Sequence, residues 1–418
     1  MNFAVALEVL EGGDIAVLVA HSDSDHRYLG DGSTYGGDMV MRVYRLDPAK
    51  IRNGSMGDSL KDGGCDSDNG CKWMKEFATD EGIAHTHQDS DTGMGDGKPW
   101  RDVNPSGIKR GTLDGEEVLY VVGQTAGSNA DLGGSTLFPG GEGYDGFLTQ
   151  ISASDGTVLE SARVSSGMTK DGISGVCVTE EGDPIVVGYT KGDMTGGVAG
   201  NGGKFDMFAR MYNRRHLDMS WTRQMGGEDD DFGYDCTAGR GEVYVLGRSR
   251  GGTGGWGGWD ARLIKIVSNT GIIEWDEWFG TAEDDMASDS RIGSSGGIIL
   301  DEVGGATVAG STRGGWGGQR LGNWDAFIAH LSPSGEYVKA YGRGTVSEGA
   351  VKVDGGEGGM GKEAEAGIAI AAAIVGVSAC VMGFLIGTKR TEQKYNRLKD
   401  GGGGVGMTKI THDEDMDL

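Results

Sequence analysis

Apolar residues along the chain fall into short runs of β-forming residues, separated by turns rich in Gly, Asp and Asn. The clearest unit predicts four strands, bounded by turn residues, over residues 173–179, 184–190, 206–213 and 218–225. Several central runs, such as Ile-Val-Val-Gly at 185–188, are apolar at consecutive positions, whereas a strand with one solvent face would alternate. The pattern therefore predicts four-stranded antiparallel meanders whose sheets are buried on both faces.

Two landmarks recur along the chain and define a repeat. A Gly closes a β-rich run, at intervals of 65, 59 and 63 residues, at Gly123, Gly188, Gly247 and Gly310. An Asp opens a later strand at Asp38, Asp145, Asp206, Asp260 and Asp325. We therefore expect five repeats of about 60 residues within residues 1–344, with a long polar insertion at 51–100 in the first repeat.

Meanders stacked face to face around an axis form a β-propeller, so the predicted fold is all-β with about five four-stranded blades. A β-helix or a sandwich is the alternative, but neither explains a period near 60 residues. The sequence leaves open whether the N-terminal blade is complete.

Three segments carry a resemblance to a known family: residues 182–190, 225–236 and 324–338, the last reading WDAFIAHLSPSGEYV. They resemble the beta-propeller repeat family found in secreted and surface proteins of bacteria and algae. The resemblance covers roughly residues 1–345 and implies a propeller fold, but it defines no catalytic residues. The chain departs from the pattern at the 51–100 insertion and at the altered acidic turn within 162–174.

One stretch predicts a transmembrane helix. Residues 366–387 form 22 residues without charge or proline, about 33 Å of helix, which is enough to cross a bilayer core of about 30 Å. Basic residues follow this stretch and acidic residues precede it, which places the C-terminus in the cytosol. A buried core helix is the alternative.

This topology divides the chain into four parts: a β-propeller ectodomain at 1–344, a Gly-rich acidic linker at 345–365, the helix at 366–387 and a cytosolic tail at 388–418. The first residues lack a basic segment and an uninterrupted apolar run, so we expect a signal peptide that is missing from this chain. The predicted location is the plasma membrane or an endomembrane, with the N-terminus on the extracytoplasmic side.

Composition narrows the classes of function. The 418 residues include 81 Gly and 6 Pro and carry a formal charge of −25. Such a glycine content disfavours a helical protein, and a strongly acidic chain disfavours a nucleic acid partner. The sequence contains no P-loop or HExxH motif, so enzymatic activity has no positive support.

Acidic turns are candidate calcium sites, because Ca²⁺ takes six to eight oxygen ligands. The candidate ligands are Asp229, Asp230, Asp284 and Asp285. The alternative is that one Asp in each turn accepts hydrogen bonds from its own backbone, as Asx turns do. Apart from this calcium hypothesis, the sequence predicts no cofactor.

The cysteines predict disulfides, consistent with an oxidising compartment. Cys65 and Cys71 flank a five-residue polar turn and predict a local bridge. Cys177 and Cys236 each lie 11 residues before the landmark Gly of their repeat, so they occupy equivalent positions in neighbouring blades. For this second pair, a disulfide and two buried free thiols both remain open. Asn53 begins an Asn-Gly-Ser glycosylation sequon.

The tail and the membrane helix carry two partner motifs. Tyr395 and Leu398 form a Tyr-x-x-apolar tetrapeptide that resembles sorting signals recognised by clathrin adaptor complexes. Gly383 with Gly387, and Ala372 with Gly376, are small residues four apart that predict helix-mediated dimerisation. The alternatives are a chance match and an Ala/Gly-rich span.

The predicted ligand-binding residues lie in loops that are too long for tight hairpins, at 190–204, 249–259 and 311–324. In a meander, these loops emerge at the same end of the blade as the acidic turns. That end gathers Trp256, Trp316, Arg250 and Arg313, which suit a sugar ring or an anchor residue of a protein. The alternative is that the tryptophans cover blade edges.

Two classes of function follow. The favoured hypothesis is a single-pass type I membrane protein whose propeller binds a protein or glycan ligand, in adhesion or as a sorting receptor. The alternative is a membrane-anchored glycan-processing enzyme with a carboxylate pair on the propeller scaffold.

Overall fold

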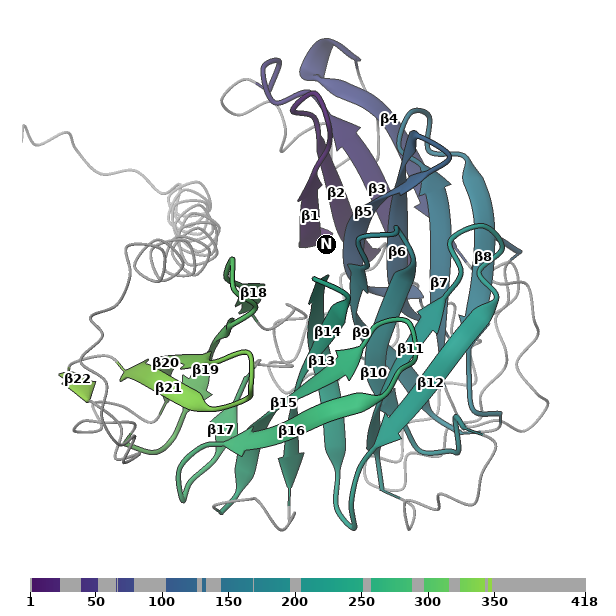
Figure 1. Ribbon diagram of the computed structural model, residues 1–418. Coiled ribbons are helices and arrows are strands. Elements are labelled where there is room, and N and C mark those ends of the chain that lie inside the picture. The colour runs from purple at the N-terminus through teal and green to yellow at the C-terminus, as the bar shows by residue number, and fades with distance from the viewer. Residues whose placement is uncertain are drawn as a thin grey trace, which may run out of the picture. The chain divides into compact units, whose positions relative to one another are not determined.

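The structure is a computed structural model (Figure 1). It describes residues 2–22, 39–51, 65, 67–78, 103–125, 130–132, 144–167, 169–195, 204–250, 257–287, 297–315, 324–342 and 345–347. The chain divides into two compact units, Met1–Gly367 and Ile368–Leu418. The second unit lies outside the described residues.

The described part of the chain is all-β, with five antiparallel sheets that follow one another in sequence. The first sheet pairs β1 (Asn2–Val9), β2 (Ile15–Ser22), β3 (Met39–Leu46) and β4 (Cys71–Phe77) in that order. The second sheet pairs β5 (Val103–Leu113), β6 (Glu116–Thr125), β7 (Asp145–Ser152) and β8 (Val158–Val164). Two short 3₁₀ turns, η1 (Ser67–Asn69) and η2 (Ala130–Leu132), lie beside these sheets.

The third sheet contains β9 (Asp171–Val178), β10 (Pro184–Thr190), β11 (Asp206–Tyr212) and β12 (Met219–Met225). The fourth contains β13 (Asp231–Gly239), β14 (Glu242–Arg250), β15 (Trp259–Val267) and β16 (Ile273–Phe279). In the fifth, β17 (Asp285–Met286) and β18 (Gly297–Leu300) both pair with β19 (Ala306–Thr312). The fifth sheet continues through β20 (Asp325–Leu331), β21 (Tyr337–Gly342) and β22 (Thr345–Ser347).

The predicted all-β class and the four-stranded antiparallel meander are confirmed, and the third sheet matches the four predicted strands within two residues at each end. One prediction was wrong in part, because residues 71–77, inside the expected insertion, form β4. Cys71, Trp73 and Phe77 are buried there. Lysines and a glutamate separate these apolar residues, so the sequence pattern of the strand resembles that of a polar loop.

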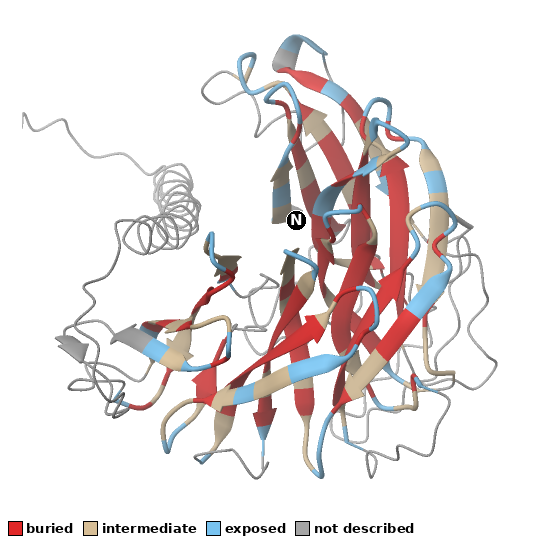
Figure 2. Cartoon of the chain, viewed as in Figure 1, coloured by how far each residue is buried: buried red, intermediate tan, exposed pale blue. Residues whose placement is uncertain are grey.

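Each pair of consecutive sheets encloses its own apolar core. Strand β1 contacts β5, β5 and β6 contact β9, β9 and β10 contact β13, and β13 contacts β18. The central strands are buried along almost their whole length, and Figure 2 shows them in red. In β20, by contrast, buried residues alternate with partly exposed ones. The consecutive apolar runs therefore reflect sheets covered on both faces.

The landmark glycines are explained by a close approach of backbones. Gly123, Gly188 and Gly247 pair with the first strand of their sheet beside a register shift in that strand. A Cβ at Gly123, Gly188, Gly247 or Gly310 would collide with a carbonyl oxygen, of Asn104, Gly172, Phe232 and Met286 respectively. Only Gly fits where the irregular first strand approaches this closely.

A tryptophan on the outer strand of three sheets contacts the next sheet. The indole N–H donates from Trp73 to Ala153 O at 3.0 Å, from Trp221 to Ser268 O at 2.6 Å and from Trp275 to Pro333 O at 3.0 Å. In the second sheet Glu160 has the equivalent register position, and Gln150 Nε2 instead donates to Arg214 O of the third sheet at 3.0 Å. These bonds join neighbouring sheets at their outer strands.

Each tryptophan ring packs against a turn glycine. Gly156, Gly271 and Gly335 have φ values of 77°, 68° and 87°, and a Cβ at Gly271 would lie 2.8 Å from the ring of Trp221. The turn requires a residue with positive φ, and the close contact with the ring leaves no space for a side chain at that residue. The same glycine therefore satisfies the local turn and the contact between sheets.

We predict that Trp221→Ala lowers the free energy of unfolding of the full chain by about 3–5 kcal/mol, because it removes a buried ring and leaves Ser268 O without its donor. Trp221→Phe should lose about 1–3 kcal/mol, since it removes the N–H donor but keeps most of the buried ring. Urea unfolding measures both values. Leu159→Ala, at a side chain that is 44% exposed, is the control. An effect of Trp221→Ala no larger than that of the control would contradict the contact.

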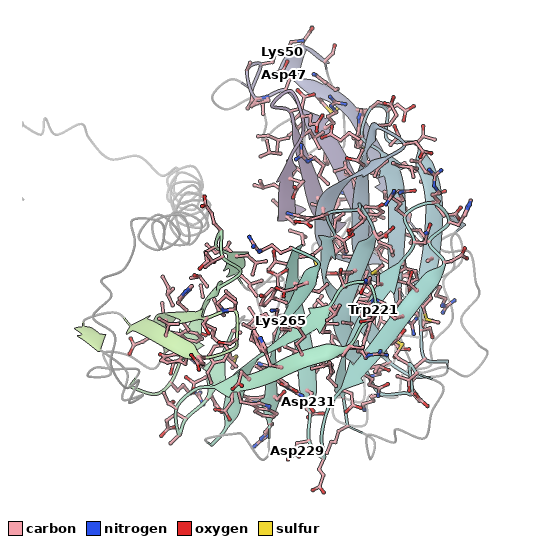
Figure 3. All side chains as sticks on the ribbon, viewed as in Figure 1. Asp47, Lys50, Trp221, Asp229, Asp231 and Lys265 are labelled. Atoms are coloured by element: carbon pink, nitrogen blue, oxygen red, sulfur yellow. A yellow bond between two sulfur atoms is a disulfide. The ribbon has the colours of Figure 1, made fainter. Side chains whose placement is uncertain are left out.

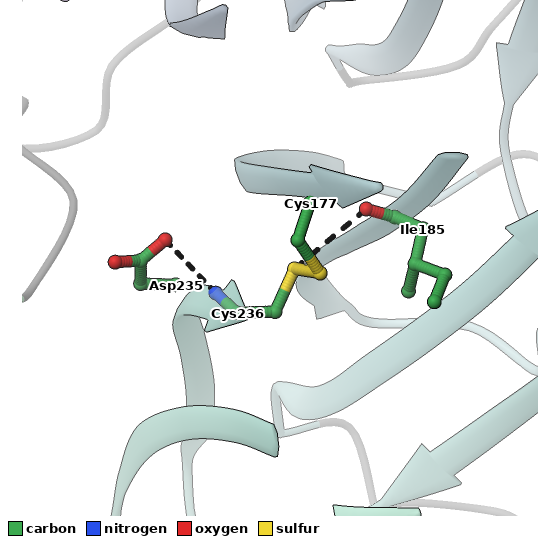
Figure 4. Close-up of a disulfide and its surroundings, with 4 residues drawn as sticks. All are labelled: Cys177, Ile185, Asp235 and Cys236. Carbon is green, nitrogen blue, oxygen red and sulfur yellow. Dashed lines mark hydrogen bonds between the residues drawn. A yellow bond between two sulfur atoms is a disulfide. The ribbon is translucent and has the colours of Figure 1, made fainter. Parts of the chain in front are cut away.

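Two disulfides are present. Cys65 and Cys71 are bridged across a separation of 6 residues, with a Cα–Cα distance of 5.2 Å. Cys177 on β9 and Cys236 on β13 are bridged with a Cα–Cα distance of 5.6 Å (Figure 4). The second bridge joins the first strands of the third and fourth sheets, and the disulfide is the alternative that holds. The two positions are not equivalent in register, because Cys177 pairs with Ile185, three residues before Gly188, and Cys236 pairs with Val245, two residues before Gly247.

Peptide mapping without reduction should recover Cys65 linked to Cys71 and Cys177 linked to Cys236. Replacing Cys177 and Cys236 together by Ala should lower the free energy of unfolding by about 2–4 kcal/mol, and the matching change at Cys65 and Cys71 should cost less, because its loop is shorter. Recovery of the four cysteines as alkylated free thiols would refute both bridges.

Candidate ligand-binding surface

One end of each of the third, fourth and fifth sheets carries a row of paired polar residues. Thr190, at the end of β10, pairs with Asp171 of β9 on one side and Asp206 of β11 on the other. Ser249 pairs in the same way with Asp231 and Asp260, and Thr312 with Asp285 and Asp325. The loops between second and third strands and the connections between sheets therefore emerge at this end, as the meander predicts. Figure 3 shows Asp229 and Asp231 there, with Lys265 and Trp221 farther along the sheets.

The first Asp of each row caps the turn before it. Asp231 Oδ2 accepts the Gly227 N–H at 2.9 Å, and Asp285 Oδ2 accepts the Thr281 N–H at 2.5 Å. Asp171 Oδ2 accepts the Ser166 N–H at 2.7 Å, so the altered turn in the third sheet keeps this geometry. Such buried carboxylates complete the hydrogen bonding of the connections between sheets.

Burial shifts the titration of these carboxylates. Asp231 is 1% exposed, and burial raises its pKa to about 6, against the lowering effects of Ser249 and Arg262. Burial also raises the pKa values of Asp171, Asp206 and Asp285. Burial therefore favours the protonated form of these four carboxyl groups more than solvent does.

The remaining acidic turn residues bind protein groups. Asp229 lies 3.2 Å from Lys204 Nζ, and Asp230 accepts the Phe205 N–H at 3.1 Å. Asp284 accepts the Trp259 N–H at 3.1 Å and pairs with Arg313 at 2.9 Å. In the described part of the chain, no three His, Cys, Asp or Glu residues are grouped to hold a metal ion. The alternative, in which one Asp of each turn binds the backbone of its own turn, thus describes Asp231 and Asp285, whereas Asp230 and Asp284 accept backbone N–H groups from another loop.

Aromatic rings form a continuous cluster between the third and fourth sheets at this end. Phe232 lies 5.2 Å from Tyr189, 5.3 Å from Phe205 and 5.8 Å from Trp259, between ring centroids. Tyr234 extends the cluster along β13, with its ring 6.4 Å from that of Phe232. The rings come from β10, β13 and β15 and from the residue before β11.

Three cations lie over the faces of these rings. Lys191 Nζ is 4.9 Å from the Phe205 centroid. The Arg248 guanidinium carbon is 4.3 Å from the Trp259 centroid and 5.3 Å from that of Phe232, and the Arg250 carbon is 5.8 Å from that of Trp259. Cations in these positions are attracted by the negative faces of the rings. We call Lys191, Phe205, Phe232, Arg248, Trp259 and Arg250 the cation–aromatic ladder.

Two of the four predicted ligand-binding residues can be placed. Arg250 belongs to the ladder. Arg313 is engaged by Asp284 and lies 4.9 Å over the Trp324 ring. Trp256 and Trp316 lie outside the described residues.

Other predicted sites also lie outside the described residues: Asn53, Tyr395, Leu398 and the apolar segment 366–387. Where the structure is described, it contains no helix of the length and apolar character needed to cross a membrane.

Sequence reasoning missed Arg248 and Lys191. Arg248 is one of several arginines on predicted strands, and nothing in the one-dimensional pattern separates it from a solvated residue. The available signal was Arg-Ser-Arg at 248–250, which places two arginines on one face of a strand. Trp259 is the ring that both arginines contact.

Comparisons with known proteins give no family assignment. No protein-family model matches the chain, and no curated protein matches it. Among solved structures, the chain is similar to a protein of unknown function from Dyadobacter fermentans, with a TM-score of 0.38 and 9% identity over 81% of this chain and 93% of that one. These low values leave the function to be argued from the chain's own residues.

Two enzymes also show similarity. A quinohemoprotein alcohol dehydrogenase from Pseudomonas putida has a TM-score of 0.32 and 10% identity over 57% of this chain. A mannose phosphorylase from Leishmania mexicana has a TM-score of 0.31 and 10% identity, again over 57% of this chain and 68% of its own. The chain spans 36% of the length of the dehydrogenase.

Asp231 predicts a pH dependence of stability. Its folded pKa of about 6 exceeds the unfolded value of about 4, so the folded state holds the proton more tightly. The contribution to stability is therefore present at low pH and is lost as pH rises through 6. Relative to Asp231→Asn, the free energy of unfolding of the full chain should fall by about 2 kcal/mol between pH 4 and pH 7.

Urea unfolding of both chains at several pH values measures this difference. Asp114→Asn is a matched control, because Asp114 is exposed and pairs with Arg215 away from the row. A constant difference between the chain and Asp231→Asn across this pH range would show that Asp231 titrates normally.

Proposed function

We propose that the chain is a single-pass type I membrane protein whose extracytoplasmic β-propeller binds a protein or glycan ligand. In this proposal the five sheets are the blades, residues 366–387 are the membrane anchor, and the ligand binds at the end that carries the ladder and the long loops. The role is that of an adhesion molecule or a sorting receptor.

The observation that carries this proposal is the ladder itself. It combines aromatic rings with cationic hydrogen-bond donors on a rigid double-sheet support, and the long loops at 190–204 and 249–259 begin beside it. Aromatic and arginine side chains dominate binding energy at protein surfaces. A position on strands rather than on loop tips keeps their geometry fixed.

The two disulfides support the proposed compartment. Disulfides persist in oxidising environments, such as the cell surface and the lumen of the secretory pathway. Two bridges within the first 236 residues are consistent with an N-terminal part on the extracytoplasmic side. The basic residues after position 387 are consistent with a cytosolic tail.

The proposal predicts that the full chain, purified in detergent, binds at least one class of molecule on an array of glycans and extracellular proteins. Replacing Trp256 and Trp316 together by Ala should abolish that binding, because their rings supply contact area, while Tm changes by less than about 2 °C. Leu159→Ala serves as the matched surface control. A large fall in Tm with binding intact would assign the two tryptophans to the core instead.

A further inference from the structure

The three cations of the ladder differ from most other described cations in what neutralises them. Arg262, which is 7% exposed, pairs with Asp276 at 2.6 Å and Asp231 at 3.4 Å, and Lys265 pairs with Glu242 and Glu274. For Lys191, Arg248 and Arg250, no carboxylate among the described residues lies within salt-bridge distance, and their partners are aromatic rings. Although the chain has a net charge of −25, these three positive charges have no anionic partner within the part of the chain that the structure describes.

The register of the fourth sheet aligns the ladder. Phe232 of β13 pairs with Arg248 of β14, and Arg250 of β14 pairs with Trp259 of β15. Arg248 and Arg250 therefore point to the same face of the sheet. Phe205 then extends the line to Lys191 in the third sheet. Lys191 and Arg250, at the two ends, are both exposed.

Arg248 lies between the two ends and is less exposed than Lys191 and Arg250. Its Nη1 approaches Met286 Sδ at 3.1 Å, while its Nε is buried without a hydrogen-bond partner among the described groups. A guanidinium held on a ring face keeps its N–H groups in fixed directions, which suits bidentate binding of an oxyanion. The ladder thus offers positive donors in a line, separated by apolar rings.

We propose that the ladder binds an acidic polysaccharide through the carboxylate or sulfate groups on its sugar rings. The inference rests on the proposed function and names the class of ligand. Arg248 and Arg250 bind the oxyanions, Lys191 supplies a further charge, and the exposed parts of the rings contact the apolar C–H faces of the sugars.

An acidic polysaccharide fits these observations better than an acidic peptide does. Each of its units presents an apolar ring face and an oxyanion at a fixed separation, which matches alternating rings and cations. An acidic peptide carries its carboxylates on flexible side chains and must lose more conformational entropy to align them. The acidic surroundings also disfavour a large acidic protein surface, since its contact would extend beyond the ladder.

The test measures binding of the detergent-purified full chain to two probes, polygalacturonate and dextran sulfate, with neutral dextran as the uncharged control. We expect binding to at least one polyanion, weakened by added NaCl because exposed charges are screened. Arg250→Ala and Lys191→Ala should each raise Kd, Arg250→Ala by about tenfold. The two probes distinguish carboxylate from sulfate as the bound group.

Further variants separate the ladder from general charge. Arg250→Lys keeps the charge and should lose only part of the affinity, because it cannot bind an oxyanion bidentately. Arg215→Ala removes an exposed arginine that pairs with Asp114 away from the ladder, and it should leave Kd unchanged. Arg248→Ala is interpreted only if its Tm matches that of the unaltered chain.

Four results would overturn the inference. Equal loss of affinity in Arg215→Ala and Arg250→Ala would show non-specific charge attraction. Tighter binding of polyglutamate than of either polysaccharide would assign the ladder to acidic peptides. Binding of neutral glycans or proteins alone would refute the acidic ligand while leaving the proposed function standing, whereas no binding to any array member or probe would refute both.

Discussion

Burial of every inner sheet on both faces is the constraint on which the rest of the described structure depends. A strand such as β11, with all seven residues buried, must satisfy its backbone through neighbouring strands and its side chains through neighbouring sheets. Packing against the next sheet is therefore as necessary for stability as hydrogen bonding within each sheet. The register shift opposite Gly123, Gly188 and Gly247 and the tryptophan that packs on a turn glycine are both consequences of this close approach between backbones and between sheets.

Polar groups are confined by the same constraint to the ends of the strands. The rows of paired Asp, Thr and Ser residues lie where the chain leaves the sheet, so their carboxylates can bind the backbone of the connections. Burying a carboxylate is unfavourable unless hydrogen bonds compensate it, and the raised pKa of Asp231 reflects that cost. The fold thus uses several of its acidic residues to hold the connections between sheets.

Most of the architecture could be predicted because the same pattern of strands and landmark residues recurs along the sequence. Gly123, Gly188, Gly247 and Gly310 mark one backbone contact, and a pattern repeated four times is stronger than any single strand prediction. Strand β4 was missed because its apolar residues alternate with lysines, which in one dimension resembles the polar insertion around it. The binding surface was located only coarsely, because Arg248 becomes distinct only when Phe232 and Trp259 from two other strands are brought beside it.

The contrast between Arg262 and Arg248 explains how a cationic surface arises in an acidic protein. The two arginines lie on adjacent strands and both contact tryptophan rings, Trp278 and Trp259 respectively. Arg262 faces Asp231 and Asp276, so its charge is internal to the fold. Arg248 faces the aromatic rings at the junction with the third sheet, and the nearby Asp284 is bound by Arg313 and by the Trp259 N–H. Positive charge is therefore concentrated at this junction by the way the carboxylates around it are already used, and not by an excess of basic residues.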